Sequence, residues 1–399
     1  IDDYGNIDKT EIQSFGLGSG VEAGAITASI QESIDIANDS SAELVAVDPG
    51  KGDYNESLTV TSNVSIVRTY NSAGTQGRPV IFGRGSGEPV VTITQASSFI
   101  SDIVMVAAEN KNGINISGGD FGLRNSIVDV NASGSGEVYG VDADSASLVD
   151  VEGSTIFTGT NPGNPDTPAK SVQELREDAK EGGIATPTED QAVGLQVAAD
   201  TLDVEETRFN NLTSGIRVTA TSTDSVEIDE NEFTKIRQEA FRATPDQITD
   251  ANTYDIDQND LVATGEGFKI SSQENDVELA SITVEENDFT RADAGYGIAG
   301  TNTPFAVEVA AKDEINGTLQ ATNNWWGDEN GPNAPSNTLP TEGANVTANG
   351  QPIIYEPYRN SPGGELINGS DLASALVDVD DENSSVTPRE VVGGNETNI

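Results

Sequence analysis

The sequence predicts an all-β fold, a parallel β-helix solenoid, from three observations. The segment VEIDENEF (226–233) recurs as YDIDQNDL (254–261) and ITVEENDF (282–289), so the copies start 28 residues apart, at 226, 254 and 282. Each copy begins apolar-polar-apolar, which is the period of a strand with one buried side. Each copy also has an Asn two places before its last apolar residue. One such unit cannot bury its own apolar side, so the repeat requires stacked coils.

Looser copies extend the repeat toward the N-terminus. We assign them to INISGGDF (114–121), LVDVEGSTI (148–156) and LDVEETRF (202–209). A second short strand is expected further along each coil, at GIRVTA (215–220), GFKISS (267–272) and GYGIAG (295–300). An immunoglobulin-like sandwich is the alternative fold, but it needs strands joined by hairpins and leaves the regular Asn spacing unexplained.

The repeated asparagines predict a column along the solenoid. Asn231, Asn259 and Asn287 occupy equivalent turn positions, and Asn324 continues the series. In stacked coils their amides are expected to hydrogen bond up and down the column. Asn also tolerates the positive φ that a tight turn requires, which favours its use at such a turn.

The chain has two tryptophans, and they are adjacent in NNWWGDENGPN (323–333). Trp326 takes the apolar register of the repeat, two residues after Asn324. An indole removes about 150–250 Å² of surface from water, so we interpret Trp325 and Trp326 as the cap of the last coil. A platform that stacks on sugar rings is the alternative interpretation.

Composition and the pattern together divide the chain into three parts. We expect an N-terminal extension at 1–25, a β-helix at 26–361 and a C-terminal tail at 362–399. An insertion at 161–193, rich in Pro and Gly at its ends, interrupts the solenoid and contains a predicted short helix. The tail holds one candidate strand, whose apolar residues are Leu376, Val377 and Val379. This strand either belongs to a solvated stalk or is donated to a neighbouring subunit.

The charge of the chain excludes several partners. Acidic residues number 67 against 20 basic ones, giving a net charge of −47. Nucleic acids and anionic membranes would be repelled, and no apolar run approaches the ~20 residues of a membrane span. An acidic surface stays soluble where salt screens its charges, which favours a salt-adapted protein of a halophilic archaeon. Cysteine and histidine are absent, which excludes disulfides, triads that depend on His and the usual zinc sites.

Asn-x-Ser/Thr sequons are abundant, which favours a glycosylated extracellular protein. The alternative is that a chain rich in Asn, Ser and Thr generates sequons by chance. The candidate residues are Asn38, Asn55, Asn63, Asn115, Asn131, Asn211, Asn316, Asn345, Asn368, Asn383 and Asn395.

Both ends of the predicted solenoid resemble a known family. The segment ASIQESIDIANDSSAELVAVDPGKGDYNESLTVTSNVSIV (28–67) resembles the opening of right-handed, pectin-lyase-like β-helix surface proteins. The resemblance implies an N-terminal helix that caps the first coil, with Ile30, Ile34 and either Ile36 or Ala37 over the core. The first strands would then bury Val45, Val47, Leu58, Val60 and Val64. The closing segments NNWWGDENGPN (323–333) and NVTANGQPIIYEPYRNS (345–361) are similar to the last coils of such proteins.

The predicted solenoid also carries candidate residues for catalysis and for metal binding. Hydrolases of the β-helix fold that the chain resembles carry adjacent Asp pairs with a Gly-His, and no His is present here. The lyases use Ca²⁺ and a basic proton acceptor, for which Arg208 with Arg217, or Arg237 with Arg242, are candidates. No complete EF-hand loop occurs. The column of Glu232, Asp260 and Asp288 predicts weak cation or Ca²⁺ binding. Like charges about 5 Å apart repel each other unless cations bridge them.

The sequence therefore predicts a structural and adhesive protein without a required cofactor. We expect an extracellular or cell-surface subunit of a filament or surface assembly, joined to its own copies head to tail through terminal segments. Surface glycans are additional expected partners. The alternatives are a β-helix that binds or degrades a polysaccharide, with lyase chemistry, and a viral fibre or spike.

Overall fold

The computed structural model describes the solenoid and parts of its flanks. The described residues are 29–40, 43–49, 54–69, 78–83, 88–132, 136–158, 192–219, 223–272, 276–289, 305–311, 313–334, 337, 341, 343–367, 389–392 and 395–398. The predicted N-terminal extension (1–25), nearly all of the insertion (161–193) and the candidate tail strand (374–380) lie outside them.

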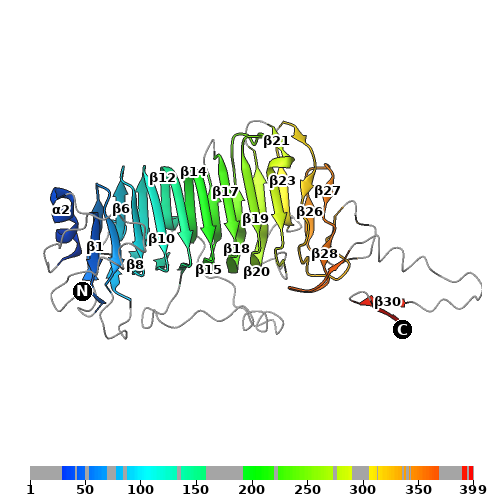
Figure 1. Cartoon of the computed structure of the whole chain (residues 1–399), viewed down its shortest axis with the longest axis horizontal. Coiled ribbons are helices and arrows are strands. Elements are labelled where there is room, and N and C mark those ends of the chain that lie inside the picture. The colour runs from blue at the N-terminus through cyan, green and yellow to red at the C-terminus, as the bar shows by residue number, and fades with distance from the viewer. Residues whose placement is uncertain are drawn as a thin grey trace, which may run out of the picture.

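The body of the protein is an all-β parallel solenoid, as the repeat predicts. Its strands form one 25-stranded sheet, in which each strand pairs with strands one coil earlier and one coil later. The chain runs around three faces in a fixed order, which we call sheets I, II and III. Figure 1 shows the strands stacked side by side along the long axis, with the helix α2 at one end and β27 and β28 at the other.

Sheet I carries the first strand of each coil. It consists of β1 (Leu44–Val47), β4 (Ser65–Arg68), β7 (Ser98–Ser101), β10 (Asp120–Arg124), the second halves of β12 (Val138–Glu152) and β14 (Ala192–Glu205), β17 (Ser225–Asp229), β19 (Thr253–Asp257), β22 (Ile282–Glu285), β25 (Leu319–Gln320) and β27 (Ile353–Ile354).

Sheets II and III follow in each coil. Sheet II consists of β2 (Tyr54–Asn55), β5 (Val80–Phe82), β8 (Val104–Glu109), β11 (Ile127–Asn131), β13 (Thr155–Phe157), β15 (Arg208–Leu212) and the first halves of β18 (Glu232–Ala243) and β20 (Asp260–Ser271). Sheet III consists of β3 (Leu58–Val60), β6 (Val91–Thr94), β9 (Ile114–Ser117), the first halves of β12 and β14, β16 (Ser214–Val218), the second halves of β18 and β20, β23 (Phe305–Ala310) and β26 (Asn345–Thr347).

Smaller elements lie beside the main sheet. They are β21 (Val277–Glu278) paired with β24 (Ile315–Asn316), the 3₁₀ turn η2 (Leu279–Ser281), β28 (Tyr358–Arg359) paired antiparallel with β29 (Leu366–Ile367), and the hairpin of β30 (Arg389–Val392) and β31 (Asn395–Asn398). The β28–β29 pair follows β27 at the C-terminal end of the main sheet, with β29 at residues 366–367. No helix within the described ranges is long and apolar enough to cross a membrane.

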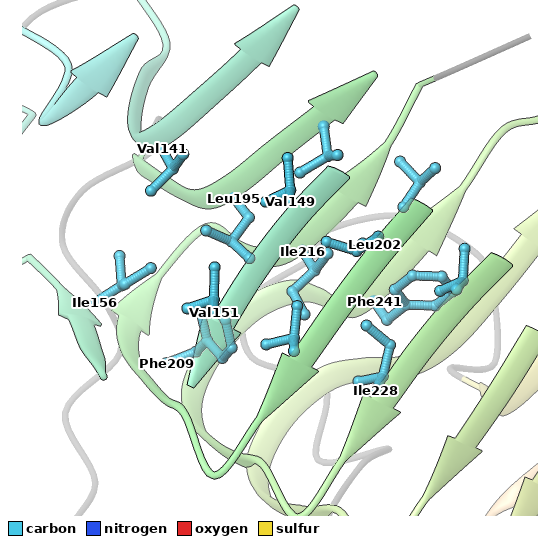
Figure 2. Close-up of a cluster of buried hydrophobic side chains, with 14 of the residues drawn as sticks. Val141, Val149, Val151, Ile156, Leu195, Leu202, Phe209, Ile216, Ile228 and Phe241 are labelled. Atoms are coloured by element: carbon cyan, nitrogen blue, oxygen red, sulfur yellow. The ribbon is translucent and has the colours of Figure 1, made fainter. Parts of the chain in front are cut away.

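Alternation of apolar and polar residues sets the core. In the repeat, Val226, Tyr254 and Ile282 are register partners, and all three are buried. Figure 2 shows how side chains from all three sheets meet inside, including Val149 and Leu202 of sheet I beside others from sheets II and III. Each fully buried Val, Leu or Ile contributes roughly 1.5–3 kcal/mol. Stacking therefore supplies the stability that one coil lacks.

One of the assigned repeat copies is out of register. INISGGDF (114–121) joins β9 of sheet III to β10 of sheet I, whereas the other copies join sheet I to sheet II. The true copy starts at Phe121, which pairs with Val149. The error arose because a strand of sheet III ending in a tight turn has the same apolar spacing. A similar correction applies to 295–300, because Val307 of β23 is the partner of Phe268; residues 295–300 themselves lie outside the described part.

The helix α2 (Ile30–Ser40) covers the first coil, as the resemblance implies. Ile30, Ile34 and Ala37 are buried, while Ile36 is exposed, so Ala37 and not Ile36 lies over the core. The first-coil residues Val45, Val47, Leu58, Val60 and Val64 are also buried.

Two side chains fasten this helix to the coil. The carboxylate of Glu56 accepts hydrogen bonds from the N–H groups of Ile30 and Gln31 at 3.1 and 3.0 Å, which satisfies free donors at the helix N-terminus. The side-chain amide of Gln31 accepts from the Thr59 N–H at 2.7 Å and donates to the Thr59 carbonyl at 3.1 Å. Gln31 thus pairs with the open edge of β3 as a neighbouring strand would.

Candidate functional site

The predicted asparagines lie in one buried column at the turn from sheet I to sheet II. The Oδ1 atom of Asn259 accepts from the backbone N–H of Asn231 at 3.0 Å and from its Nδ2 at 3.1 Å. Asn287 holds Asn259 in the same way, and Asn324 holds Asn287 at 2.8 and 3.1 Å. All four are at most 1% exposed, so water does not reach the backbone groups of these turns. The side-chain amides supply the hydrogen bonds that water would otherwise make.

The column continues toward the N-terminus with hydroxyl groups. Asn231 Oδ1 accepts from the N–H of Thr207 at 2.9 Å, and Thr207 Oγ1 accepts from the N–H of Ser154 at 3.3 Å. Ser154 Oγ in turn accepts from the N–H of Ser126 at 3.2 Å, and Ser126 Oγ accepts from the N–H of Ile103 at 3.2 Å. The looser repeat copies already place Thr207 and Ser154 at this position. Thr207 and Ser154 share with the asparagines only the ability to accept a hydrogen bond. A pattern that requires Asn at this position therefore does not find them.

The positive φ of this turn belongs to the residue before each asparagine. Glu230, Gln258, Glu286 and Asn323 have φ between 52° and 60° and directly precede the column residues, as does Glu206 at 47°. The expected explanation, that Asn is used because it tolerates positive φ, is therefore wrong. The asparagines are required for their amides.

Trp326 is a core residue and does not close the solenoid. It is fully buried and stacks on Phe289 with ring centroids 5.0 Å apart and planes 10° apart. The next coil follows it: Asn324 O accepts the N–H of Arg359, and β27 pairs with β25. The expected cap of the last coil is corrected accordingly, because Tyr358, also fully buried, lies in the coil after it. Trp325 extends the register column of Asp260 and Asp288 on sheet II and is only partly exposed.

The outer side of sheet III carries a run of basic residues. Arg217 pairs in register with Arg242, and Arg242 with Lys269, so three cations occupy one position on successive coils. We call them the cationic column. Parallel strands lie about 4.8 Å apart, so the three charges follow the solenoid axis at that interval. The pairs expected from the sequence were Arg208 with Arg217 and Arg237 with Arg242. The strand register instead places Arg217 beside Arg242.

Each cation of the column has acidic partners. Arg217 lies 2.8 Å from Glu137, Arg242 lies 3.6 Å from Glu239, and Lys269 lies 2.8 Å from Glu308. Glu239 is buried and is the register neighbour of Glu266. We call the cationic column and these glutamates, together with Tyr139, the charged face.

The pKa values on the charged face reflect burial and pairing. The hydrogen bond from Arg217 lowers the pKa of Glu137, while burial raises the pKa of Glu266. Burial and a hydrogen bond to Glu137 raise the pKa of Tyr139 to about 12. Burial alone would lower the pKa of Lys269, but its contacts with Glu308 and Glu266 outweigh it and raise the value. Lys269 therefore stays protonated at neutral pH and serves binding better than proton abstraction.

The outer side of sheet I is acidic. Its two outward columns contain Asp150, Asp203, Glu227 and Asp255 in one, and Glu152, Glu205, Asp229, Asp257 and Glu285 in the other. Burial and neighbouring carboxylates raise the pKa values of Asp203 and Asp229 to about 6. Arg124 pairs with Asp150 and Glu152 at one edge, and Arg359 pairs with Glu286 at the other.

The predicted column of Glu232, Asp260 and Asp288 is present on sheet II as register neighbours. Glu232 and Asp288 are buried, and Glu232 receives Arg208 at 3.1 Å. Within the described ranges, no group of three or more acidic residues is arranged to hold a metal ion.

The remaining candidate residues are scattered. The described sequons lie on different elements, with Asn55 on β2, Asn115 on β9, Asn211 on β15 and Asn316 on β24. Asn368, Asn383 and the tail residues Leu376, Val377 and Val379 lie outside the described part. No family model matches this chain, and neither a curated protein nor a solved structure matches it significantly.

Proposed function

We propose that this chain is a structural and adhesive subunit of an extracellular assembly of a salt-adapted organism, joined to its own copies end to end. The observation that carries the proposal is the placement of exposed apolar side chains. Among the described residues, the large hydrophobic side chains that are exposed are Ile36, Ile354 and Leu366, at 36%, 44% and 51%. Ile36 lies on α2 at one end of the solenoid, and Ile354 lies on β27 at the opposite end (Figure 1). Leu366 lies on β29, which pairs with β28 at that same end.

This placement favours contact between opposite ends. The sides of the rod carry much of a net charge of −47, so side-by-side contacts are repelled until salt screens them. If the α2 end of one copy binds the β27 end of the next copy, the contact joins two different surfaces. Such a heterologous contact forms an open filament unless rotation closes it into a ring.

Electron microscopy and sedimentation of the full chain test the proposal in multimolar salt, where the Debye length is about 3 Å or less. We expect rods joined at their ends. The double variant Ile354→Asp/Leu366→Asp should remain monomeric, while Thr94→Asp, which adds a charge at an exposed position on the side of sheet III, should assemble normally. Assembly of the double variant at the wild-type level would reject the end contact.

A polysaccharide-binding or lyase function is the second candidate, and the cationic column favours it. Three cations at coil spacing, each paired with a glutamate, offer donors and acceptors to a periodic polymer such as a glycan. The test measures binding to a panel of polysaccharides, together with the ultraviolet absorbance of unsaturated lyase products. Arg242→Gln and Lys269→Gln should each weaken binding. Arg124→Gln removes an equally ion-paired Arg from sheet I and should leave binding unchanged.

A further inference from the structure

The sequons differ in how far the fold leaves their amides available. N-glycosylation joins Asn Nδ2 to C1 of a sugar carried on a lipid-linked phosphate donor. The bond from C1 to the phosphate oxygen breaks, the phosphate leaves with the electron pair, and the amide gives up one proton. The product is a bulky group that must project into solvent. An Asn whose side chain is held between coils cannot carry it in this fold.

Three described sequon residues meet this requirement. Asn55 ends β2, Asn131 ends β11 and Asn316 ends β24, and each is exposed. None of the three side chains makes a hydrogen bond within the described part of the chain, so the Nδ2 atoms are free to project outward.

Two sequon residues use Nδ2 inside the structure. Asn211 adopts a φ of 57° within β15 of sheet II, and its Nδ2 donates to the Thr158 carbonyl of the preceding coil at 2.7 Å. Asn38 donates from Nδ2 to Thr61 Oγ1 at 3.4 Å and accepts a hydrogen bond from Ser62, which ties α2 to the first coil. A sugar on either nitrogen would displace a contact that joins two coils or joins the cap to its coil.

Three further sequon residues are held through Oδ1. Asn63 accepts from the N–H of Ser97 at 2.9 Å, which bridges two coils. Asn115 accepts from Asn112 Nδ2 at 2.8 Å, and Asn345 accepts from Asn333 Nδ2 at 2.7 Å. These contacts fix the orientation of each amide through its oxygen, and they do not use Nδ2; Asn63 is also exposed.

We propose that Asn55, Asn131 and Asn316 are glycosylated, and that Asn38 and Asn211, whose Nδ2 atoms donate within the fold, stay unmodified. The assignment rests on the proposed extracellular function, because it requires passage through a secretory compartment. Asn55 and Asn131 belong to sheet II strands and Asn316 belongs to β24. The glycans therefore leave the outer sides of sheets I and III uncovered.

The test is secretion of the full chain from an N-glycosylating host, followed by glycopeptide mass spectrometry. Enzymatic release of the glycans in heavy-oxygen water labels each formerly occupied Asn. We expect labels at Asn55, Asn131 and Asn316. Ser57→Ala, Ser133→Ala and Thr318→Ala should each remove the mass of one glycan, whereas Ser40→Ala, at the Asn38 sequon, should remove none.

Two outcomes would overturn the assignment. One is occupancy of Asn38 or Asn211 in the folded, secreted protein at the level of the three exposed sites. The other is absence of sugar from all three while a reporter glycoprotein from the same cells is modified. Neither outcome decides the end-to-end contact, which the Ile354→Asp/Leu366→Asp variant tests separately, on protein made without glycans in a bacterial host.

Discussion

Asn259 and Asn287 are joined twice across one coil step. Asn287 Oδ1 accepts from the backbone N–H of Asn259 at 3.0 Å and from Asn259 Nδ2 at 2.9 Å. The Nδ2 of Asn259 also donates to the carbonyl groups of Ile228 and Asp257 at 2.8 and 2.7 Å. One side chain thus satisfies groups from three successive coils at a site closed to water.

The substitution Asn259→Ala is expected to destabilise the solenoid. It leaves buried N–H and carbonyl groups without partners, at a cost of about 1–3 kcal/mol for each unsatisfied group. Denaturant unfolding in high salt measures the free energy of unfolding. Asn316→Ala, the same change at an exposed Asn, should alter that free energy by less than about 0.5 kcal/mol. Equal effects of the two substitutions would show that the column contributes no net stability.

The two tryptophans are expected to behave differently. Trp326→Ala removes a fully buried indole stacked on Phe289 and should cost about 3–5 kcal/mol. Trp325→Ala removes a partly exposed one and should cost less. Fluorescence of the chain with only Trp326 should resist quenching by iodide, whereas the chain with only Trp325 should be quenched. The reverse order of quenching would contradict the assigned burial.

The free energy of unfolding is expected to fall as pH rises through the pKa values of carboxyl groups on the outer side of sheet I. Asp203 and Asp229 have folded-state pKa values raised to about 6, above the ~3.9 of an unfolded Asp. The folded state therefore binds more protons, so the stabilisation is complete below about pH 4 and is lost as pH rises through 6. Unfolding free energies measured from pH 4 to 8 check the slope, and the double variant Asp203→Asn/Asp229→Asn should flatten it.

Salt should reduce this pH dependence only in part. Repulsion from neighbouring carboxylates is screened by salt, whereas the contribution of burial, which is the larger cause at both residues, is not. A slope that vanishes completely in multimolar salt would assign the shifts to charge repulsion alone.

Gln31→Leu is expected to loosen the first coil. The substitution leaves the Thr59 N–H and carbonyl without the side-chain amide that pairs with them. Hydrogen exchange at Thr59 should accelerate relative to the middle of the solenoid, since its protection depends on this pairing. Asp35→Ala, which removes another contact of Gln31 on the exposed side of α2, is the control and should leave exchange at Thr59 unchanged.

The strongest repeat copies were sufficient to predict the fold. Val226, Tyr254 and Ile282 are register partners in the structure because a strand with one buried side fixes its register. The same rule made 114–121 look equivalent, since apolar spacing does not distinguish one sheet from another. Residue spacing also failed to place Val307 opposite Phe268, because the connection from sheet II to sheet III is longer between Phe289 and Val307 than in the preceding coil.

The candidate sites were harder to predict than the fold. The basic residues of the charged face are 25 and 27 positions apart, and only the register of β16, β18 and β20 shows that Arg217, Arg242 and Lys269 form one column. The role of Gln31 likewise depends on the position of Thr59, which no local pattern encodes. Residues that act across coils become recognisable only when the coils are aligned.

The 28-residue step between Asn231 and Asn259 makes the length of this rod adjustable in whole units. Removing residues 232–259 would join Asn231 to Asp260, which is the register partner of Glu232, so the next strand would enter sheet II in the correct phase. The helix contacts the first coil, and the β28–β29 pair contacts the last coils, as far back as Glu286. Evolution or design can therefore change how far such a protein reaches without redesigning either end.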